Sequence, residues 1–292
     1  MTTVRPTPHA DITARDARKR RQTLMQDRLL PLLISAFFII PIVFVFYWMV
    51  SMSFQTQVEI SSRTPTFWSA LPTTEWYSQL LRRVPFVRYT LNSLIVGGGA
   101  TGIGLAIGLP AAYAIARWRL SGLGTLFLIT RITPAISFLV PWFILAKRLN
   151  MGDSLVIITL LHITITLPLI IWIMIGFFEA LPDDLEQAAT VDGCSPWQSF
   201  LLVAVPLVRP GIVAAGILAF IQSWNNFLFA AVLGGPDSQT LPVTVYGMLS
   251  FEQANWGPLA AAATLVCLPV IIGTIFFQRQ LVEGLTAGAL KG

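Results

Sequence analysis

Six long apolar runs dominate the pattern of hydrophobic and polar positions along the chain. An α-helix needs about 20 apolar residues to cross the hydrocarbon core of a bilayer, and each run is close to that length. The pattern therefore predicts an all-α, polytopic membrane protein with six transmembrane helices. The runs lie at about 29–52, 88–115, 123–146, 154–177, 208–232 and 258–280.

The composition agrees with this prediction and argues against other classes. The 292 residues are 55% hydrophobic and only 11% charged, whereas soluble domains carry about 25% charged residues. The net charge of +5 does not indicate nucleic-acid binding, because most basic residues flank apolar runs and set membrane orientation. Cys194 and Cys267 lie in different segments without a CxxC spacing, so we expect neither a disulfide framework nor a metal site.

The distribution of charge also predicts the topology. Residues 1–28 are polar and basic, so we expect a partly disordered cytoplasmic segment with a short helix near its end. The following run is too long for a signal-peptide h-region, and an even number of spans places both termini in the cytoplasm. The predicted parts are a cytoplasmic segment 1–28, a first transmembrane helix 29–52, external loops 53–87 and 233–257, a core 88–280 with a cytoplasmic loop 179–207, and a flexible cytoplasmic tail 281–292.

The longest charged interruption of the apolar pattern runs from Glu179 to Pro210. Pro182 suits a first helical position, and the acidic residues after it suit a helix N-terminus. Asp192 and Gly193 break the pattern, and Ser195–Gln198 restarts it with a capping box. We expect two short helices joined by a hinge, exposed for another protein to hold. The alternative is an ordinary connecting loop.

Glycines in the second run match GxGxxG over residues 97–102. We do not interpret them as a nucleotide-binding loop, because no strand precedes them and no acidic residue follows about 20 positions later. The pairs Gly98/Gly102 and Gly104/Gly108 are each four residues apart, which lets helices approach closely in lipid. These glycines therefore predict a helix-packing face.

Polar residues inside the runs each allow a functional and a structural interpretation. Arg131 either has a function or extends to the membrane interface. His162 shares one helical face with Thr159 and Thr166. These three residues either line a hydrated cavity or form hydrogen bonds between helices. For the histidine we favour the second alternative. Trp224 stands among amides in the middle of the fifth run, a combination that suits a sugar ring and its hydroxyls but also suits helix association. The amides are Gln222, Asn225 and Asn226.

The sequence shows no motif for catalysis or for binding a nucleotide or a metal ion. It contains no GxxxxGK[ST], HExxH or GxSxG motif, so we expect no phosphate-binding loop and no catalytic or metal-binding residues. Carboxylates are almost absent from the runs, so no proton- or sodium-coupled relay is expected. Energy for any pumping would have to enter from another protein, and the exposed charged segment is the obvious place.

Several short motifs resemble a known family. Gln187–Ala189, Asp192-Gly193 and Val205-Pro206 resemble the EAA motif (EAAxxDGA, then LP) of membrane subunits of binding-protein-dependent ABC importers. Further segments are similar to the smaller, six-span permease subunit of maltose-type carbohydrate importers. These segments are Leu91–Ser93, Ala111–Ala114, Trp224-Asn225 with Phe227–Phe229, and Gly284–Gly292. The resemblance covers residues 88–292 well and the first run loosely.

The resemblance implies the transmembrane fold of a type I ABC importer in the cytoplasmic membrane of a bacterium or archaeon. It implies four partners: a second permease subunit, a dimer of ATP-binding subunits, an extracytoplasmic solute-binding protein and the surrounding membrane lipid. ATP and magnesium would bind to the ATPase subunits, so this chain would carry no cofactor and would not itself be an enzyme.

The resemblance also assigns roles to residues. Those that couple to the ATPase would be Glu186, Gln187, Ala188, Ala189, Asp192, Gly193, Ser195, Trp197 and Phe200. The polar residues inside the apolar runs, and not the resemblance, give the candidate substrate-pathway residues, which are Arg131, Thr159, His162, Trp224, Asn225 and Asn226. Two positions depart from the family pattern, because Gln187 replaces the motif's Glu and Asn226 replaces an acidic residue.

Two functions from other classes would require residues of a different kind. A stand-alone secondary carrier needs a coupling carboxylate within the spans, and a membrane-embedded enzyme needs a catalytic cluster. The sequence displays neither.

Overall fold

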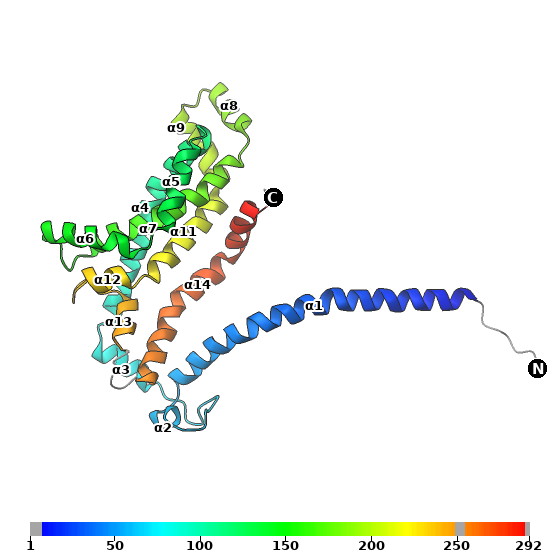
Figure 1. Ribbon diagram of the computed structural model, residues 1–292, viewed down its shortest axis with the longest axis vertical. Helices are drawn as coiled ribbons and strands as arrows, with labels where there is room; N and C mark the ends of the chain where they lie inside the picture. Colours follow the sequence, from blue (N-terminus) through cyan, green and yellow to red (C-terminus); the bar gives the residue numbers. More distant parts are fainter. Residues whose placement is uncertain (1–7, 249–254, 290–292) are drawn as a thin grey trace, which may run out of the picture.

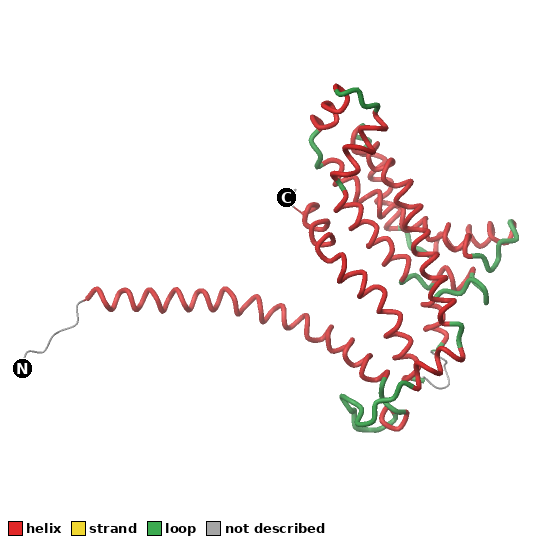
Figure 2. The backbone as a smooth tube through the Cα atoms, turned by 180° about the vertical axis from the view of Figure 1, so that it is seen from behind, coloured by secondary structure: helices red, strands yellow, loops and turns green. Residues whose placement is uncertain are grey.

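The computed structural model describes residues 8–248 and 255–289, and every regular element in these ranges is a helix. Most helices form one bundle, while α1 (Pro8–Ser53) leads away from it towards the N-terminus (Figure 1). Seen from behind, helices account for nearly all of the chain (Figure 2). The predicted all-α fold is confirmed for the described residues.

Two parallel helices form the centre of the bundle. These are α4 (Phe86–Arg117) and α7 (Leu155–Glu179), which pack along each other over most of their length. The helix α11 (Arg209–Trp224) packs against both, and α14 (Trp256–Ala289) packs against α11. The core between them is aliphatic and aromatic, so the bundle is held together by side-chain packing.

Glycine lets α4 and α7 come close. A Cβ added at Gly104 or Gly108 would lie 2.8 Å from the side chain of Ile170 on α7. These two glycines confirm the predicted packing face. Gly98 and Gly102 have no such neighbour within 4 Å, so the prediction was wrong for that pair within this chain.

Not every predicted span is a single straight helix. Four described helices are long and apolar enough to cross a membrane, and two bent helix pairs would raise the number to six. The predicted span 123–146 consists of α5 (Ser121–Ile132) and α6 (Ile136–Arg148), which meet at 89°. The bend follows from Pro134, which lacks a backbone N–H and keeps Thr133 extended.

The predicted span 208–232 is also interrupted. The helix α11 ends at Trp224, and α12 (Leu228–Leu233) follows after a short break. The side-chain oxygen of Asn226 accepts a hydrogen bond from the Phe229 backbone N–H at 3.2 Å, which caps the start of α12. The polar cluster 222–226 therefore lies at a helix break and not, as predicted, in the middle of a span.

Both ends of the chain are more helical than the sequence suggested. The helix α1 begins at Pro8 and runs without a break into the first apolar run, and α14 continues to Ala289. The expected partly disordered start and flexible tail are thus helical where they are described. Residues 1–7, 249–254 and 290–292 of the predicted N-terminal segment, second external loop and tail lie outside the described residues.

We call residues 179–207, between α7 and α11, the elbow. The elbow contains α8 (Asp183–Val191), α9 (Pro196–Ser199), the π-helical turn η1 (Phe200–Ala204) and α10 (Val205–Leu207). Its last part, Pro196–Leu207, meets α11 at 78°. Figure 1 shows α8 and α9 at the opposite end of the molecule from α2 (Gln57–Ile60) and α3 (Glu75–Arg83).

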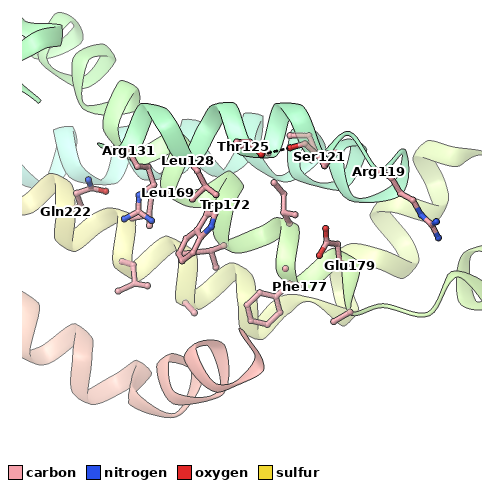
Figure 3. Close-up of a pocket in the computed structure, with 18 of the residues that line it drawn as sticks. Arg119, Ser121, Thr125, Leu128, Arg131, Leu169, Trp172, Phe177, Glu179 and Gln222 are labelled. Atoms are coloured by element: carbon pink, nitrogen blue, oxygen red, sulfur yellow. Dashed lines mark hydrogen bonds between the residues drawn. The ribbon is translucent and has the colours of Figure 1, made fainter. Parts of the chain in front are cut away.

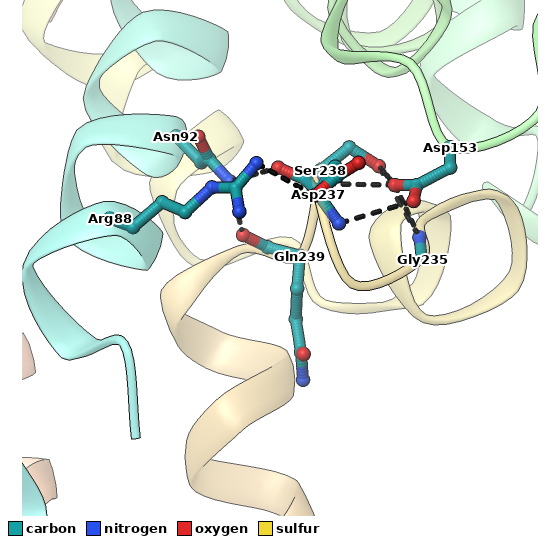
Figure 4. Close-up of polar contacts among 7 residues, drawn as sticks. All are labelled: Arg88, Asn92, Asp153, Gly235, Asp237, Ser238 and Gln239. Carbon is teal, nitrogen blue, oxygen red and sulfur yellow. Dashed lines mark hydrogen bonds and ion pairs between the residues drawn. The ribbon is translucent and has the colours of Figure 1, made fainter. Parts of the chain in front are cut away.

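A polar network around Asp153 orders the loop between α12 and α13 (Leu241–Gly247). The Asp153 carboxylate accepts hydrogen bonds from the backbone N–H groups of Gly235, Asp237 and Ser238, at 2.8–3.1 Å, and from the Ser238 hydroxyl (Figure 4). Burial raises the pKa of Asp153, but these hydrogen bonds outweigh it and hold the pKa below its usual value. The network is therefore strongest at neutral pH and weakens only when acid protonates the carboxylate.

The same loop is tied to the start of α4. Arg88 forms an ion pair with Asp237 at 2.8 Å, and the Asn92 side chain donates to the carbonyl groups of Asp237 and Gln239 (Figure 4). Asp153 lies just before α7, so the loop joins the beginnings of both central helices. This end of the bundle has a defined shape although it is built from loops.

We predict that Gly108→Val destabilises the protein by about 1–3 kcal/mol, because the added methyl groups would overpack the α4–α7 contact. Gly102→Val is the matched control, since no neighbouring atom lies within 4 Å of a Cβ there. Thermal unfolding in detergent should show a lower midpoint for the first variant only. Equal midpoints for the two variants would contradict the assigned packing face.

Candidate functional site

The elbow has the local structure that its sequence predicts. The Ser195 hydroxyl accepts from the Gln198 backbone N–H at 3.3 Å, and the Gln198 side chain accepts from the Ser195 N–H at 2.8 Å. This confirms the capping box. Gly193 has a φ of +90°, a conformation that side chains disfavour, so it forms the hinge. Pro182 is the N-cap of α8, one position earlier than predicted.

The elbow exposes large apolar side chains beside polar ones. Val191 is 87% exposed, Trp197 59% and Leu185 43%. Among the residues expected to couple to a partner, six lie on the exposed side. They are Gln187, Ala188, Asp192, Gly193, Ser195 and Trp197. Large apolar side chains grouped on an exposed, ordered segment are typical of a protein-binding surface.

The other expected coupling residues face the bundle. Ala189 and Phe200 are 7% and 3% exposed. The Phe200 ring lies 4.9 Å from that of Tyr113 on α4 and 6.2 Å from that of Phe178 on α7, measured between centroids. The elbow is therefore packed onto the two central helices through aromatic rings and is not a loose connection.

Glu186 also points inward, where Arg117 at the end of α4 holds it. The Arg117 Nε donates to a Glu186 carboxylate oxygen at 2.8 Å, and the Tyr113 hydroxyl donates to the other oxygen at 2.6 Å. Arg117 and Tyr113 were not among the residues predicted to couple to a partner. Their spacing of four residues at the end of an apolar run was the available signal, because it puts both on one helical face.

A cavity of about 1150 Å³ lies between α5, α7 and α11. Arg131 and Trp172 meet in its wall, with Gln222 near them and Arg119 at the other end (Figure 3). Its polar lining residues are Arg119, Ser121, Thr125, Arg131, Glu179, Gln222 and Asn225. Apolar walls with a few polar groups are typical of a site for a small molecule.

Arg131 and Trp172 form the most distinctive contact in the cavity. The guanidinium carbon lies 5.1 Å from the centroid of the Trp172 ring, within the range of a cation–π interaction. Trp172 remains 45% exposed, so part of the ring is open to the cavity. We overlooked Trp172 in the sequence, although a tryptophan inside an otherwise aliphatic run was a visible signal.

The cavity brings together only some of the expected pathway residues. Arg131 and Asn225 line it, whereas Thr159, His162, Trp224 and Asn226 do not. His162 is buried, and its Nδ1 lies 2.6 Å from the Ser223 hydroxyl. His162 therefore joins α7 to α11, which is the structural interpretation of the polar stripe.

Trp224 and Thr159 are likewise used in packing. Trp224 is 2% exposed, stacks on Phe220 and donates its Nε1–H to the Val266 carbonyl at 3.3 Å. The Thr159 hydroxyl donates to the Leu155 carbonyl within α7. Groups of three or more metal-ligating side chains are absent from the described residues.

Comparison with known proteins gives consistent matches. Residues 104–286 match the family model described as "Binding-protein-dependent transport system inner membrane component". The chain is 33% identical to the diacetylchitobiose uptake system permease protein DasC of Streptomyces coelicolor, over 91% of this chain and 98% of that protein. It is 38% identical to the trehalose transport system permease protein SugB of Mycobacterium tuberculosis, over 74% of this chain and 81% of that protein.

A solved structure has the same fold. A chain of a bacterial ABC transporter involved in the import of the acidic polysaccharide alginate aligns with a TM-score of 0.74. The alignment covers 95% of this chain and 99% of that chain, at 18% sequence identity. The alignment extends over nearly all of both chains, so the overall fold is a known one.

Proposed function

Because the chain belongs to the family of binding-protein-dependent transport system inner membrane components, we propose that it is a permease subunit of an ATP-driven importer for a carbohydrate. The cargo would be a sugar, oligosaccharide, polyol or sugar derivative. The relatives named for uptake of trehalose and diacetylchitobiose support this class. The chain is a multi-pass protein of the inner membrane and is not itself an ATPase.

The observation that carries the proposal is the elbow. It is a capped segment with exposed apolar side chains, and it is packed onto the central helices of a bundle that contains a cavity. A dimer of ATP-binding subunits would hold these side chains and bind ATP and magnesium, so this chain would need no cofactor. The elbow and both termini would then lie in the cytoplasm.

Other surfaces support the remaining partners of an importer. Apolar residues of α1 are widely exposed, with Phe37 at 73% and Leu33 at 65%, so lipid and a second permease subunit are suitable neighbours. The ordered loop around Asp153 lies at the far end of α4 from the elbow and offers a docking surface for an extracytoplasmic solute-binding protein.

We propose that the cavity forms the part of the substrate pathway that lies in this subunit. A partly exposed indole offers a flat face for a sugar ring, and Arg131, Gln222 and Asn225 offer hydrogen bonds to hydroxyl groups. The described cavity wall holds both acidic and basic groups, so it does not by itself select a charged sugar.

Purification and thiol labelling test the assembly and its orientation. The chain should co-purify with an ATP-binding subunit and a second permease, and a lone chain that transports sugar would contradict the proposal. In a Cys267→Ser background expressed without the ATPase, a membrane-impermeant maleimide should label Cys194 in inside-out vesicles. Labelling of Cys194 in intact cells would overturn the cytoplasmic position of the elbow.

We predict that Gly193→Pro abolishes uptake while membrane insertion is retained. Proline cannot adopt the φ of +90° found at Gly193, and it removes the hydrogen bond from the Gly193 N–H to the Thr190 carbonyl. Gly193→Asn is the matched control, because asparagine tolerates positive φ, and it should keep most of the activity. Normal uptake by the proline variant would argue against a coupling role for the hinge.

We predict that Trp172→Leu lowers uptake roughly tenfold, which corresponds to about 1.4 kcal/mol, because the sugar loses an aromatic face. Trp172→Phe keeps an aromatic ring and should retain most of the uptake. The assay uses the carbohydrate that thermally stabilises the cognate binding protein. Equal losses in both variants would indicate that Trp172 supports packing and not the substrate.

A further inference from the structure

A compact polar cluster joins the end of α4 to the start of α8. We call it the α4–α8 clamp, and it consists of Tyr113, Arg117, Asp183 and Glu186. Arg117 is the last residue of α4, and both acidic residues lie in the first turn of α8. The side chains of Arg117 and Glu186 are only 14% and 16% exposed, so water screens their interaction weakly.

Every branch of the Arg117 guanidinium is used within this chain. Nε and Nη2 donate to one oxygen of Glu186, at 2.8 Å and 2.5 Å. Nη1 donates to the Asp183 carboxylate at 2.8 Å and to the Leu181 carbonyl at 3.2 Å. Asp183 and Glu186 are three residues apart and share one helical face. The planar Arg117 guanidinium therefore binds α8 at two points and fixes the direction of α8 relative to α4.

Tyr113 completes the arrangement. Its hydroxyl donates to the second oxygen of Glu186 at 2.6 Å, so both carboxylate oxygens are occupied. The Tyr113 ring also packs edge-on against Phe178 near the end of α7, with 5.4 Å between centroids. Glu186 is therefore fixed relative to both central helices and not only to Arg117.

The clamp is a direct polar link between α8 and the bundle. Otherwise α8 packs mainly on α9 and η1, which belong to the same elbow. By contrast, α4 packs along α7 and also against α11 and α13. A displacement of α8 that passes through the clamp thus reaches the helices that surround the cavity.

We propose that Arg117 is a positioning residue that makes α8 and α4 move as one body, so that movement of the elbow displaces the bundle. This proposal rests on the coupling role of the elbow in the proposed function. Arginine suits the task better than lysine, because its rigid fork binds two carboxylates in fixed directions. Glu186 then faces the bundle, and the neighbouring exposed positions Gln187 and Ala188 are left for the partner.

The test uses the complete importer complex, with ATP and vanadate as the probe and spin labels as reporters. One label is attached to Cys194 in a Cys267→Ser background and reports on the elbow. A second protein carries Val87→Cys with both native cysteines changed to serine. Val87 is 64% exposed at the start of α4, so its label reports on the far end of that helix.

In the wild-type background, ATP with vanadate should change the spectra of both labels. Arg117→Gln should keep the change at Cys194 but reduce the change at position 87 at least threefold, and Arg117→Lys should be intermediate. Glu186→Gln should resemble Arg117→Gln, and the double variant should be no worse than either, because both remove one interaction. Arg148→Gln, at the end of α6, is the control and should behave like the wild type.

The outcomes separate the two proposals. If ATP moves neither label in the wild-type background, the ATPase-coupled function is wrong. If each label responds in Arg117→Gln as it does in the wild type, the proposed function stands and the positioning role of Arg117 is wrong. Without nucleotide, Arg117→Gln should also make the Cys194 label more mobile than Arg148→Gln does, and equal mobility would overturn the clamp whatever the transport result.

Discussion

The close packing of α4 on α7 is the contact on which the rest of the structure depends. Glycine at positions 104 and 108 removes the side chains that would hold the two helices apart, and in lipid such packing replaces the hydrophobic effect as the main attraction. The pair is tied by polar groups at both ends. The Asp153 network joins their beginnings, and the α4–α8 clamp joins the end of α4 to the segment that follows α7.

This arrangement explains how a displacement of the elbow can reach the helices around the cavity. Membrane helices satisfy their backbone hydrogen bonds internally, so each one keeps its helical form when the surrounding lipid changes. A stiff elbow fixed to a stiff helix pair passes on a displacement with little loss. Beside this helix pair, residues of α5, α7 and α11 enclose the cavity, so a displacement of the pair reaches its wall.

Much of the candidate site could be predicted because its signals are local. The capping box at Ser195 depends on residues three positions apart, and the hinge at Gly193 depends on one residue's backbone preference. The direction in which each side chain of the elbow faces was not predictable. Gln187 and Glu186 are neighbours with similar chemistry, yet one is exposed and the other is held by Arg117, 69 residues earlier in the chain.

The sequence alone determined the membrane class, the number and approximate limits of the apolar runs, the elbow and the family, since hydropathy and short motifs are properties of consecutive residues. Only the tertiary structure decided which polar groups meet. It separated Arg131 and Asn225, which line the cavity, from His162 and Trp224, which join helices. It also turned Pro134 from one proline among several into a near right-angle bend. The physical reason is that a polar side chain in a membrane helix needs a partner, and which partner it meets is set by how distant helices pack.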